Sequence, residues 1–320
     1  MKKLGFLVIA MVLTVALFAD DGEVLPQGVF RLTNLLYVNT YDKAFDEDFK
    51  SQDTNKATVA GYGVALEYGL IDCLSLGLQW TPAYNFYSDV KVYGDPNKKV
   101  TIAPLAGVFA GAKFQLLGEQ GIAKSNHMRF AVTAGGFIPV PYNAEDQITN
   151  SLEGKDFVEP CDSVAFMIGA RTDFDYIFPK FFDINVHTEF MRKLPVDADK
   201  DFAASYNNAT VGAGIKEVDY GFYYFVQLFP KCEVNLTNRI SFNITTPLEY
   251  RYTSETKWDG EKAIDDYYSC SAKLAPGIYV NFLDAPLPFE LEIDYEMNVA
   301  GRNVNNDKFF SITFTPYFSF

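Results

Sequence analysis

The last twelve residues, FFSITFTPYFSF, alternate between apolar and polar side chains. Successive side chains of a β-strand point to opposite faces, so this stretch predicts a strand with one apolar and one polar face. The apolar face carries Phe310, Ile312, Phe314, Phe318 and Phe320. The polar face carries Ser311, Thr313, Thr315, Tyr317 and Ser319. A strand of this kind needs a different environment on each side.

Similar alternation predicts about twelve strands along the whole chain. The candidate strands are residues 28–39, 57–69, 74–82, 103–117, 128–140, 162–176, 182–190, 218–230, 240–252, 267–282, 288–299 and 309–320. Short connections between them alternate with long polar ones. The short connections are 71–73, 118–126, 178–180, 237–239 and 283–286, and the long ones are 40–56, 84–99, 143–161, 193–216, 254–266 and 300–308.

This rhythm predicts an all-β fold, a transmembrane antiparallel up-and-down β-barrel of about twelve to fourteen strands, with short periplasmic turns and long external loops. A closed barrel satisfies the backbone groups between neighbouring strands, as a bilayer requires. After Phe18 the chain has no apolar run of the roughly 18 residues that a transmembrane helix needs. A soluble lipocalin-like barrel or sandwich is the alternative, but such folds have no reason to alternate short and long connections.

The segment 288–299 indicates which face would line water. Its carboxylates share one parity, and four carboxylates in a row cannot face lipid. They are Glu290, Glu292, Asp294 and Glu296. The other expected lumen-lining residues are Arg171, Asp173, Asp175, Asp183, His187, Glu189, Arg251 and Lys273, with Arg31, Glu67, Lys113, Arg129 and Glu249.

Carboxylates outnumber cations in this set, and rings of carboxylate favour cations. The pattern therefore predicts a channel for passive passage of small solutes with a cation-leaning lumen. The alternative is that these charges pair across strands and fill a structural barrel. A net charge of −14 excludes nucleic acid as a partner, because phosphate recognition needs a basic surface.

Residues 1–19 have the features of a secretory signal peptide. Lys2 and Lys3 precede an apolar run that ends at Leu17, and Ala16 and Ala19 are small residues suited to cleavage. The mature chain is expected to begin near Asp20. Residues 20–27 then form a short periplasmic segment and residues 28–320 form the barrel.

The signal peptide, the alternating connections and the aromatic last strand together resemble the bacterial outer-membrane β-barrel class. The resemblance implies that Phe310, Ile312, Phe314, Phe318 and Phe320 are an assembly signal, read by the barrel assembly machinery. It also implies contact with outer-membrane lipid and pairing of the last strand with the first. Pro316 departs from the pattern and predicts a bulge or a local break in the ladder, because proline has no backbone donor.

The stretch VLPQGVFRLTNLLYVNTYDKAFDEDF also resembles transporters similar to the long-chain fatty-acid transporter FadL. That resemblance implies transport of hydrophobic substrates as the alternative function. Only residues 20–27 precede the predicted barrel, too few to form the long hatch of that family. A structural or surface-interaction role through exposed loops, such as the one around Tyr84, Phe86 and Tyr87, is a further alternative.

No enzyme, cofactor or metal site is predicted. The histidines are His127, near a predicted turn, and His187, which with Glu189 bonds to neighbours more readily than it binds a metal. The run 197–201 spaces acids like the start of a calcium loop, but Phe202 stands where the loop needs glycine.

The four cysteines, Cys73, Cys161, Cys232 and Cys270, allow three pairings in an oxidising compartment. Topology favours Cys161 with Cys270 near the external end. Four free thiols are the alternative.

Overall fold

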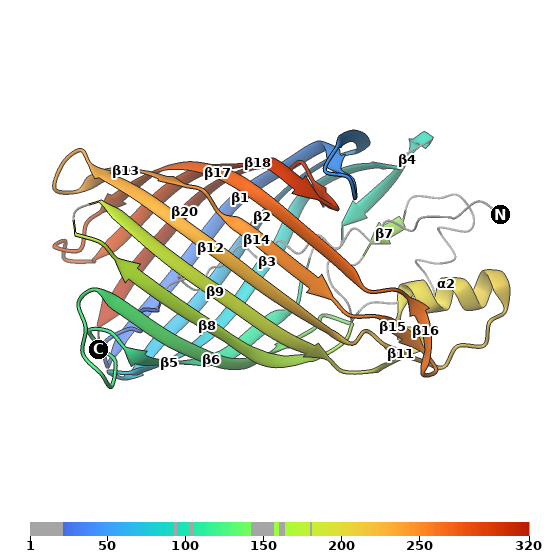
Figure 1. Cartoon of the computed structure of the whole chain (residues 1–320), viewed down its shortest axis with the longest axis horizontal. Coiled ribbons are helices and arrows are strands. Elements are labelled where there is room, and N and C mark those ends of the chain that lie inside the picture. Colours follow the sequence, from blue (N-terminus) through green and yellow to red (C-terminus); the bar gives the residue numbers. More distant parts are fainter. Residues whose placement is uncertain are drawn as a thin grey trace.

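The computed structural model describes residues 22–92, 95–102, 105–141, 157–159, 164–179 and 181–319. In this part of the chain, twelve antiparallel strands form a closed up-and-down barrel (Figure 1). In chain order they are β1 (Val29–Phe45), β2 (Ser51–Ile71), β3 (Leu74–Val92), β5 (Val108–Leu117), β6 (Met128–Ile138), β8 (Met167–Ile177), β9 (Phe182–Lys193), β12 (Phe222–Asn235), β13 (Ile240–Thr245) continued by β14 (Leu248–Thr253), β17 (Tyr267–Asn281), β18 (Phe289–Arg302) and β20 (Lys308–Ser319). The predicted fold class is confirmed.

The first and last strands close the barrel, as predicted. β1 pairs antiparallel with β20, from Val29 opposite Ser319 to Thr40 opposite Lys308. The two strands pair without a register shift, but Leu32 and Thr33 have no paired residue on β20. Pro316 lies at this gap, where it has no N–H to donate. Pro316 therefore causes a local break in the ladder and no bulge.

The first three strands are much longer than predicted. β3 continues to Val92, so Tyr84, Phe86 and Tyr87, which were expected in a long loop, lie on a strand. β1 continues to Phe45 and β2 begins at Ser51, so most of the expected long loop 40–56 is a hairpin with a tight turn. Asp46 Oδ1 accepts backbone hydrogen bonds from Asp48 and Lys50, each at 2.9 Å. The hydrogen bond from Lys50 holds the pKa of Asp46 below its ordinary value. Beyond the bilayer both faces of a hairpin meet water, so the alternation that marks a membrane strand disappears there.

One predicted strand, 240–252, is divided at Thr246 and Pro247 into β13 and β14. Pro247 cannot donate to the ladder, but its carbonyl accepts from Lys273 N at 2.9 Å. The alternation of inward and outward residues continues across the break, because Ser241, Asn243 and Thr245 are buried while Leu248 and Tyr250 are exposed.

The outer surface of the barrel is apolar. Large side chains at alternate positions point outward, including Leu36, Leu78, Phe190, Tyr250 and Ile278. Among the described residues, no helix is long and apolar enough to span a bilayer. This outer surface is the lipid-facing band of a transmembrane β-barrel.

Figure 1 shows the end of the barrel where the C-terminus lies, and aromatic residues of the strand ends and turns at this end pack in pairs. Ring centroids are 6.2 Å apart for Phe30 and Phe318, 4.9 Å for Phe282 and Phe289, and 4.5 Å for Tyr176 and Phe178. Phe310, Phe314, Ile312 and Phe318 lie on β20, and Phe320 lies outside the described residues. Aromatic side chains at this level form the girdle typical of a membrane interface.

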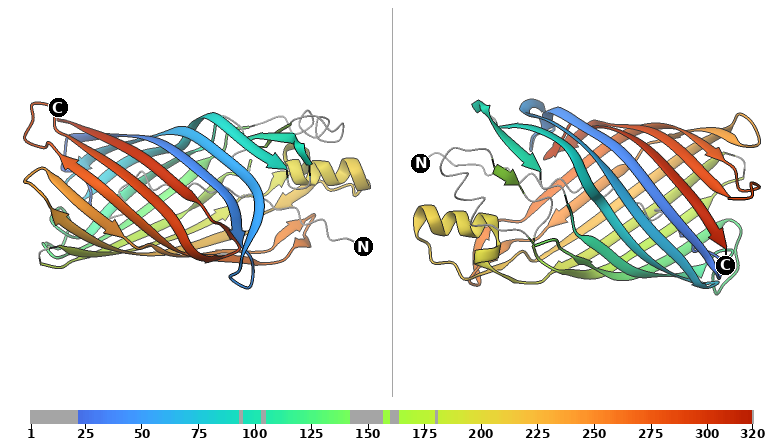
Figure 2. Two further views of the ribbon diagram at one scale, coloured as in Figure 1. Left: turned by 90° about the horizontal axis from the view of Figure 1, so that it is seen from above. Right: turned by 180° about the vertical axis from the view of Figure 1, so that it is seen from behind.

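The opposite end carries a small four-stranded sheet and a helix (Figure 2). The remaining elements are β4 (Asp95–Ile102), β7 (Phe157–Glu159), β10 (Val196–Asp197), a 3-10 helix η1 (Ala198–Lys200), α2 (Phe202–Val211), β11 (Glu217–Asp219), β15 (Thr256–Trp258), β16 (Glu261–Ile264) and β19 (Val304–Asn305). The sheet order is β10-β11-β15-β16. Ala198, Ala204, Ile215 and Val218 form its core.

The acidic run 197–201 serves this small unit. Asp201 caps α2 by accepting from Ala204 N at 2.9 Å, and Tyr220 donates to its other oxygen. Burial raises the pKa of Asp201. Asp197 pairs with Lys200 at 2.6 Å. These partners account for two of the acids that resemble a calcium loop.

Candidate functional site

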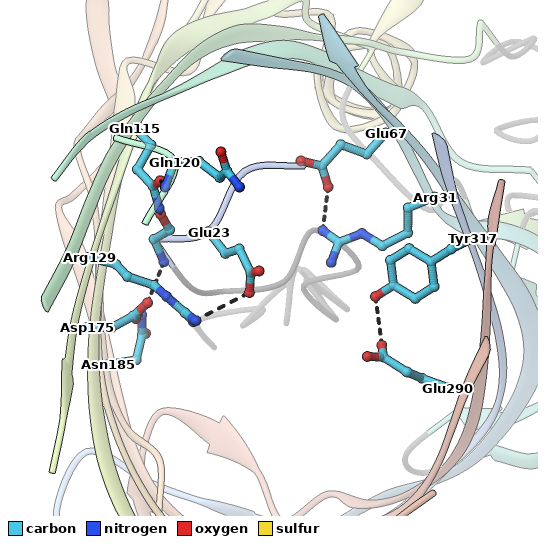
Figure 3. Close-up of polar contacts among 11 residues, drawn as sticks. Glu23, Arg31, Glu67, Gln115, Gln120, Arg129, Asp175, Asn185, Glu290 and Tyr317 are labelled. Carbon is cyan, nitrogen blue, oxygen red and sulfur yellow. Dashed lines mark hydrogen bonds and ion pairs between the residues drawn. The ribbon is translucent and has the colours of Figure 1, made fainter. Parts of the chain in front are cut away.

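The N-terminal segment Gly22–Gln27 lies inside the barrel, near its short-turn end (Figure 3). Gly22 N donates to Asp175 Oδ2 at 2.7 Å, and Gln115 donates to the carbonyl of Gly22. Leu25 N donates to Ser75 Oγ at 2.9 Å. Because these partners belong to β8, β5 and β3, the segment crosses the lumen.

Charge and burial also hold this segment. Glu23 pairs with Arg129 at 3.4 Å, and Val24 and Leu25 are only 1% and 5% exposed. A Cβ at Gly69 would collide with the backbone carbonyls of Leu25 and Pro26, so glycine is required for this close approach. The described part of the expected short segment 20–27 thus lies in the lumen, although it is far shorter than the long hatch of the FadL family. The sequence offered one signal, since Ser75 and Gln115 have inward parity and are polar.

Around the segment, several inward side chains pair across strands. Arg31 of β1 forms an ion pair with Glu67 of β2, and Tyr317 donates to Glu290 Oε2 at 2.8 Å (Figure 3). Asp175 also accepts from Asn185 Nδ2 at 2.7 Å. This end of the lumen is thus polar and closely bonded.

Farther along the barrel, Arg171 organises a second cluster. Its guanidinium pairs with Glu189, donates to Gln79 Oε1 at 3.0 Å, and lies 3.8 Å from the centroid of the Phe109 ring. Tyr223 donates to the same Glu189, which is 3% exposed. Each oxygen of this buried carboxylate has a donor, so we interpret Glu189 as a residue that stabilises the barrel.

His187 lies beside this cluster, and its Nδ1 is 2.7 Å from Asp173 Oδ1. The two residues are neighbours in the register of β8 and β9. In the ranges that the structure describes, no three His, Cys, Asp or Glu residues are arranged to hold a metal ion. His187 bonds to Asp173, whereas Glu189 bonds to Arg171 and Tyr223.

A third cluster centres on Lys273 of β17. Its Nζ is 2.8 Å from Glu249 Oε1 and 2.8 Å from Glu296 Oε1, so one cation bridges two carboxylates. Gln227 adds a hydrogen bond to Glu249 at 2.9 Å. Arg251 packs against aromatic rings, 5.0 Å from the centroid of Phe225.

The acids of β18 are only partly neutralised. Glu296 has Lys273, but among the described residues no Lys or Arg forms an ion pair with Glu290, Glu292 or Asp294. Lys231 of β12, a cation that was not among the predicted lumen residues, interacts electrostatically with Glu292 but forms its ion pair with Glu233, at 3.0 Å. Asp183 lies opposite Lys231 in the ladder of β9 and β12. The wall at β18 therefore holds three carboxyl groups without an ion-pair partner in the described part of the chain.

An apolar patch interrupts the polar wall. Leu35, Tyr37, Ala65 and Phe309 form a buried cluster on the inner face of β1, β2 and β20. The rings of Tyr37 and Phe309 stack with centroids 5.6 Å apart, and Tyr37 donates to Asn85 Oδ1 at 2.6 Å. Phe309 has the parity of Ser311, which was the signal for its inward position.

Cys73, Cys232 and Cys270 have free thiols, and Cys161 lies outside the described residues. The predicted pairing of Cys161 with Cys270 therefore falls outside the described residues. His127 lies in the turn between β5 and β6.

The twelve-stranded barrel, with its apolar exterior and polar interior, places the chain among bacterial outer-membrane β-barrels. Protein-family models and curated proteins give no match. The fold is similar to that of an outer membrane channel from Pseudomonas putida F1, with 14% identity over 93% of this chain and 98% of that chain and a TM-score of 0.63.

Two further structures show a weaker likeness. The NanC porin is 8% identical over 89% of this chain and 100% of that chain, with a TM-score of 0.39. A Pseudomonas aeruginosa FadL homologue is 10% identical over 91% of this chain and 90% of that chain, with a TM-score of 0.34. At these scores the likeness carries no argument about function.

Proposed function

We propose that the chain forms a narrow outer-membrane channel for small solutes and that its lumen favours cations. The single observation that carries this proposal is the set of β18 carboxylates without an ion-pair partner among the described residues, Glu290, Glu292 and Asp294. The Pseudomonas putida protein of similar fold is described as an outer membrane channel, which supports the first half of the proposal.

Other carboxylates in the lumen form ion pairs, which distinguishes them from these three acids. Glu67, Glu189 and Glu249 each have an Arg or Lys partner, so their charges are largely balanced locally. An unbalanced carboxylate in a low-dielectric tube attracts cations more strongly than it would in bulk water. Ion pairs therefore balance the charge of part of the lumen, and the unpaired carboxylates of β18 are the part of the wall that would select cations.

The test is the reversal potential of single channels in a planar bilayer under a salt gradient. Wild type is expected to be cation-selective, and a triple variant E290Q/E292Q/D294N is expected to lose most of that selectivity. A matched control, D197N/D199N/D265N, removes three charges from the external end. Equal selectivity in wild type and the β18 variant would refute the proposal, as would equal effects of the two triple variants.

A second function, transport of hydrophobic substrates, is favoured by one observation, the inward patch of Leu35, Tyr37, Ala65 and Phe309. Apolar side chains on a lumen wall suit an apolar or aromatic solute. Uptake of a monoaromatic hydrocarbon into liposomes that contain the barrel tests it. Uptake that falls in L35S/F309S while ion selectivity is unchanged would favour this function over the cation channel.

A further inference from the structure

Three residues meet side by side on adjacent strands of the β18 wall. Asn243 of β13 lies opposite Gly277 of β17, and Gly277 lies opposite Asp294 of β18. A Cβ at Gly277 would collide with both Asn243 Oδ1 and Asp294 Oδ1. Two oxygen atoms that only accept hydrogen bonds therefore converge over the same glycine.

Rotation of the Asn243 amide does not remove this meeting of two acceptor oxygens. Asn243 is 2% exposed, and its Oδ1 has no hydrogen-bond partner in the described part of the chain. Its Nδ2 donates to Glu292 Oε1 at 3.3 Å. Turning the amide over would direct Nδ2 to Asp294 and leave Oδ1 facing Glu292. In either orientation one carboxylate faces an acceptor, which is costly for a buried group.

The neighbouring cation does not occupy this position. Lys231 Nζ is 3.0 Å from Glu233 Oε2 and 6.0 Å from the centroid of the Tyr279 ring. A positive group that enters through the lumen would satisfy the acceptors at Gly277. Glu292 and Asp294 are partly exposed, so a solute in the lumen can reach them.

We propose that Glu292, Asp294 and Asn243 Oδ1 form a binding site for a small cation in the lumen wall. Carboxylate and amide oxygens are the ligands that hard cations such as Ca²⁺ prefer, and they also accept the N–H groups of a primary ammonium. The site deepens the proposed channel function, because the cation reaches it through the lumen. Gly277 is part of the site, since only glycine leaves room for both oxygens.

Isothermal titration calorimetry of the refolded barrel with CaCl₂, and separately with methylammonium chloride, tests the site. Asp294→Asn and Asn243→Leu are each expected to weaken cation affinity about tenfold or more. Asn243→Asp adds a carboxylate oxygen in the same place and is expected to strengthen Ca²⁺ binding. Glu249→Gln, which removes a lumen charge already paired with Lys273, is the matched control.

Unchanged Ca²⁺ and methylammonium affinities in Asp294→Asn and Asn243→Leu would overturn the site. An infrared band of a protonated carboxyl at neutral pH, absent in Asp294→Asn, would also overturn it by identifying the shared positive group as a proton. Stronger binding of methylammonium than of Ca²⁺ would identify an ammonium site and support the proposal. Failure of the channel function looks different, since the barrel would then bind the cation and conduct no current.

Discussion

Removal of the N-terminal segment tests whether it narrows the channel. A chain refolded from Gly28 lacks every residue that crosses the lumen in the described structure, and a chain refolded from Asp20 retains them. Twelve strands about 4.8 Å apart and tilted by about 40° give a backbone radius of about 12 Å. The same relation gives about 8 Å for eight strands, whose interior side chains just fill.

The radius of the twelve-stranded barrel exceeds that of the filled eight-stranded barrel by about 4 Å, which leaves an open bore about 8 Å in diameter. An extended peptide with its side chains is about 5 by 10 Å in cross-section, so the segment blocks most of that bore. We expect the shorter chain to conduct at least about twice as much current per channel as the longer chain. Single-channel recording in a planar bilayer measures this.

The control for folding is circular dichroism together with the heat-dependent gel mobility of both refolded chains. A Val24→Gly/Leu25→Gly variant keeps the length of the segment but removes its two buried side chains, and should give intermediate conductance with frequent transitions. Equal conductance of the two chains, with both folded, would show that the segment does not narrow the pore.

Three further predictions concern ion pairs. Arg171→Leu leaves Glu189 buried without its cation and should destabilise the barrel by about 3–5 kcal/mol, measured by urea unfolding in detergent. The hydrogen bond from Arg192 lowers the pKa of Asp219 below 3.8, so its contribution is present above that pH and is lost as the pH falls through the lower folded value. Asp219→Asn should remove this acid-sensitive step from Trp258 fluorescence, with an effect below about 1 kcal/mol because the pair is partly exposed. Lys273→Met leaves its two carboxylate partners unneutralised and should make the channel more cation-selective, measured as a larger reversal potential.

Period-two alternation was sufficient to predict the barrel and the approximate strand number, and the resemblance to outer-membrane barrels implied the closing pair. Membrane strands must present lipid on one side, so residues such as Leu78 and Phe190 leave a clear pattern. Outside the bilayer that constraint ends, which is why the extension of β1 to Phe45 and the small sheet around α2 were not predicted.

The lumen was harder to predict from the sequence. Parity placed Arg171 and Glu189 on one face, but their bonds to Gln79, Phe109 and Tyr223 depend on strand register and barrel curvature. The N-terminal segment left no periodic signal, because it belongs to no strand. Its contacts join residues far apart in the chain, such as Gly22 and Asp175, and only the closed barrel brings them together.

The position of the N-terminal segment limits where the protein can be labelled. A tag fused directly ahead of Gly22 would have to share the pore with the residues bonded to Asp175 and Gln115, and a tag after β20 would interrupt the aromatic terminus. The loop at Gly212 and Gly214 is open, since added side chains would meet no other atom within 4 Å. An epitope or fluorophore inserted there, after α2, would show whether this end of the barrel faces the surface of intact cells, and it would leave the lumen and the strands unchanged.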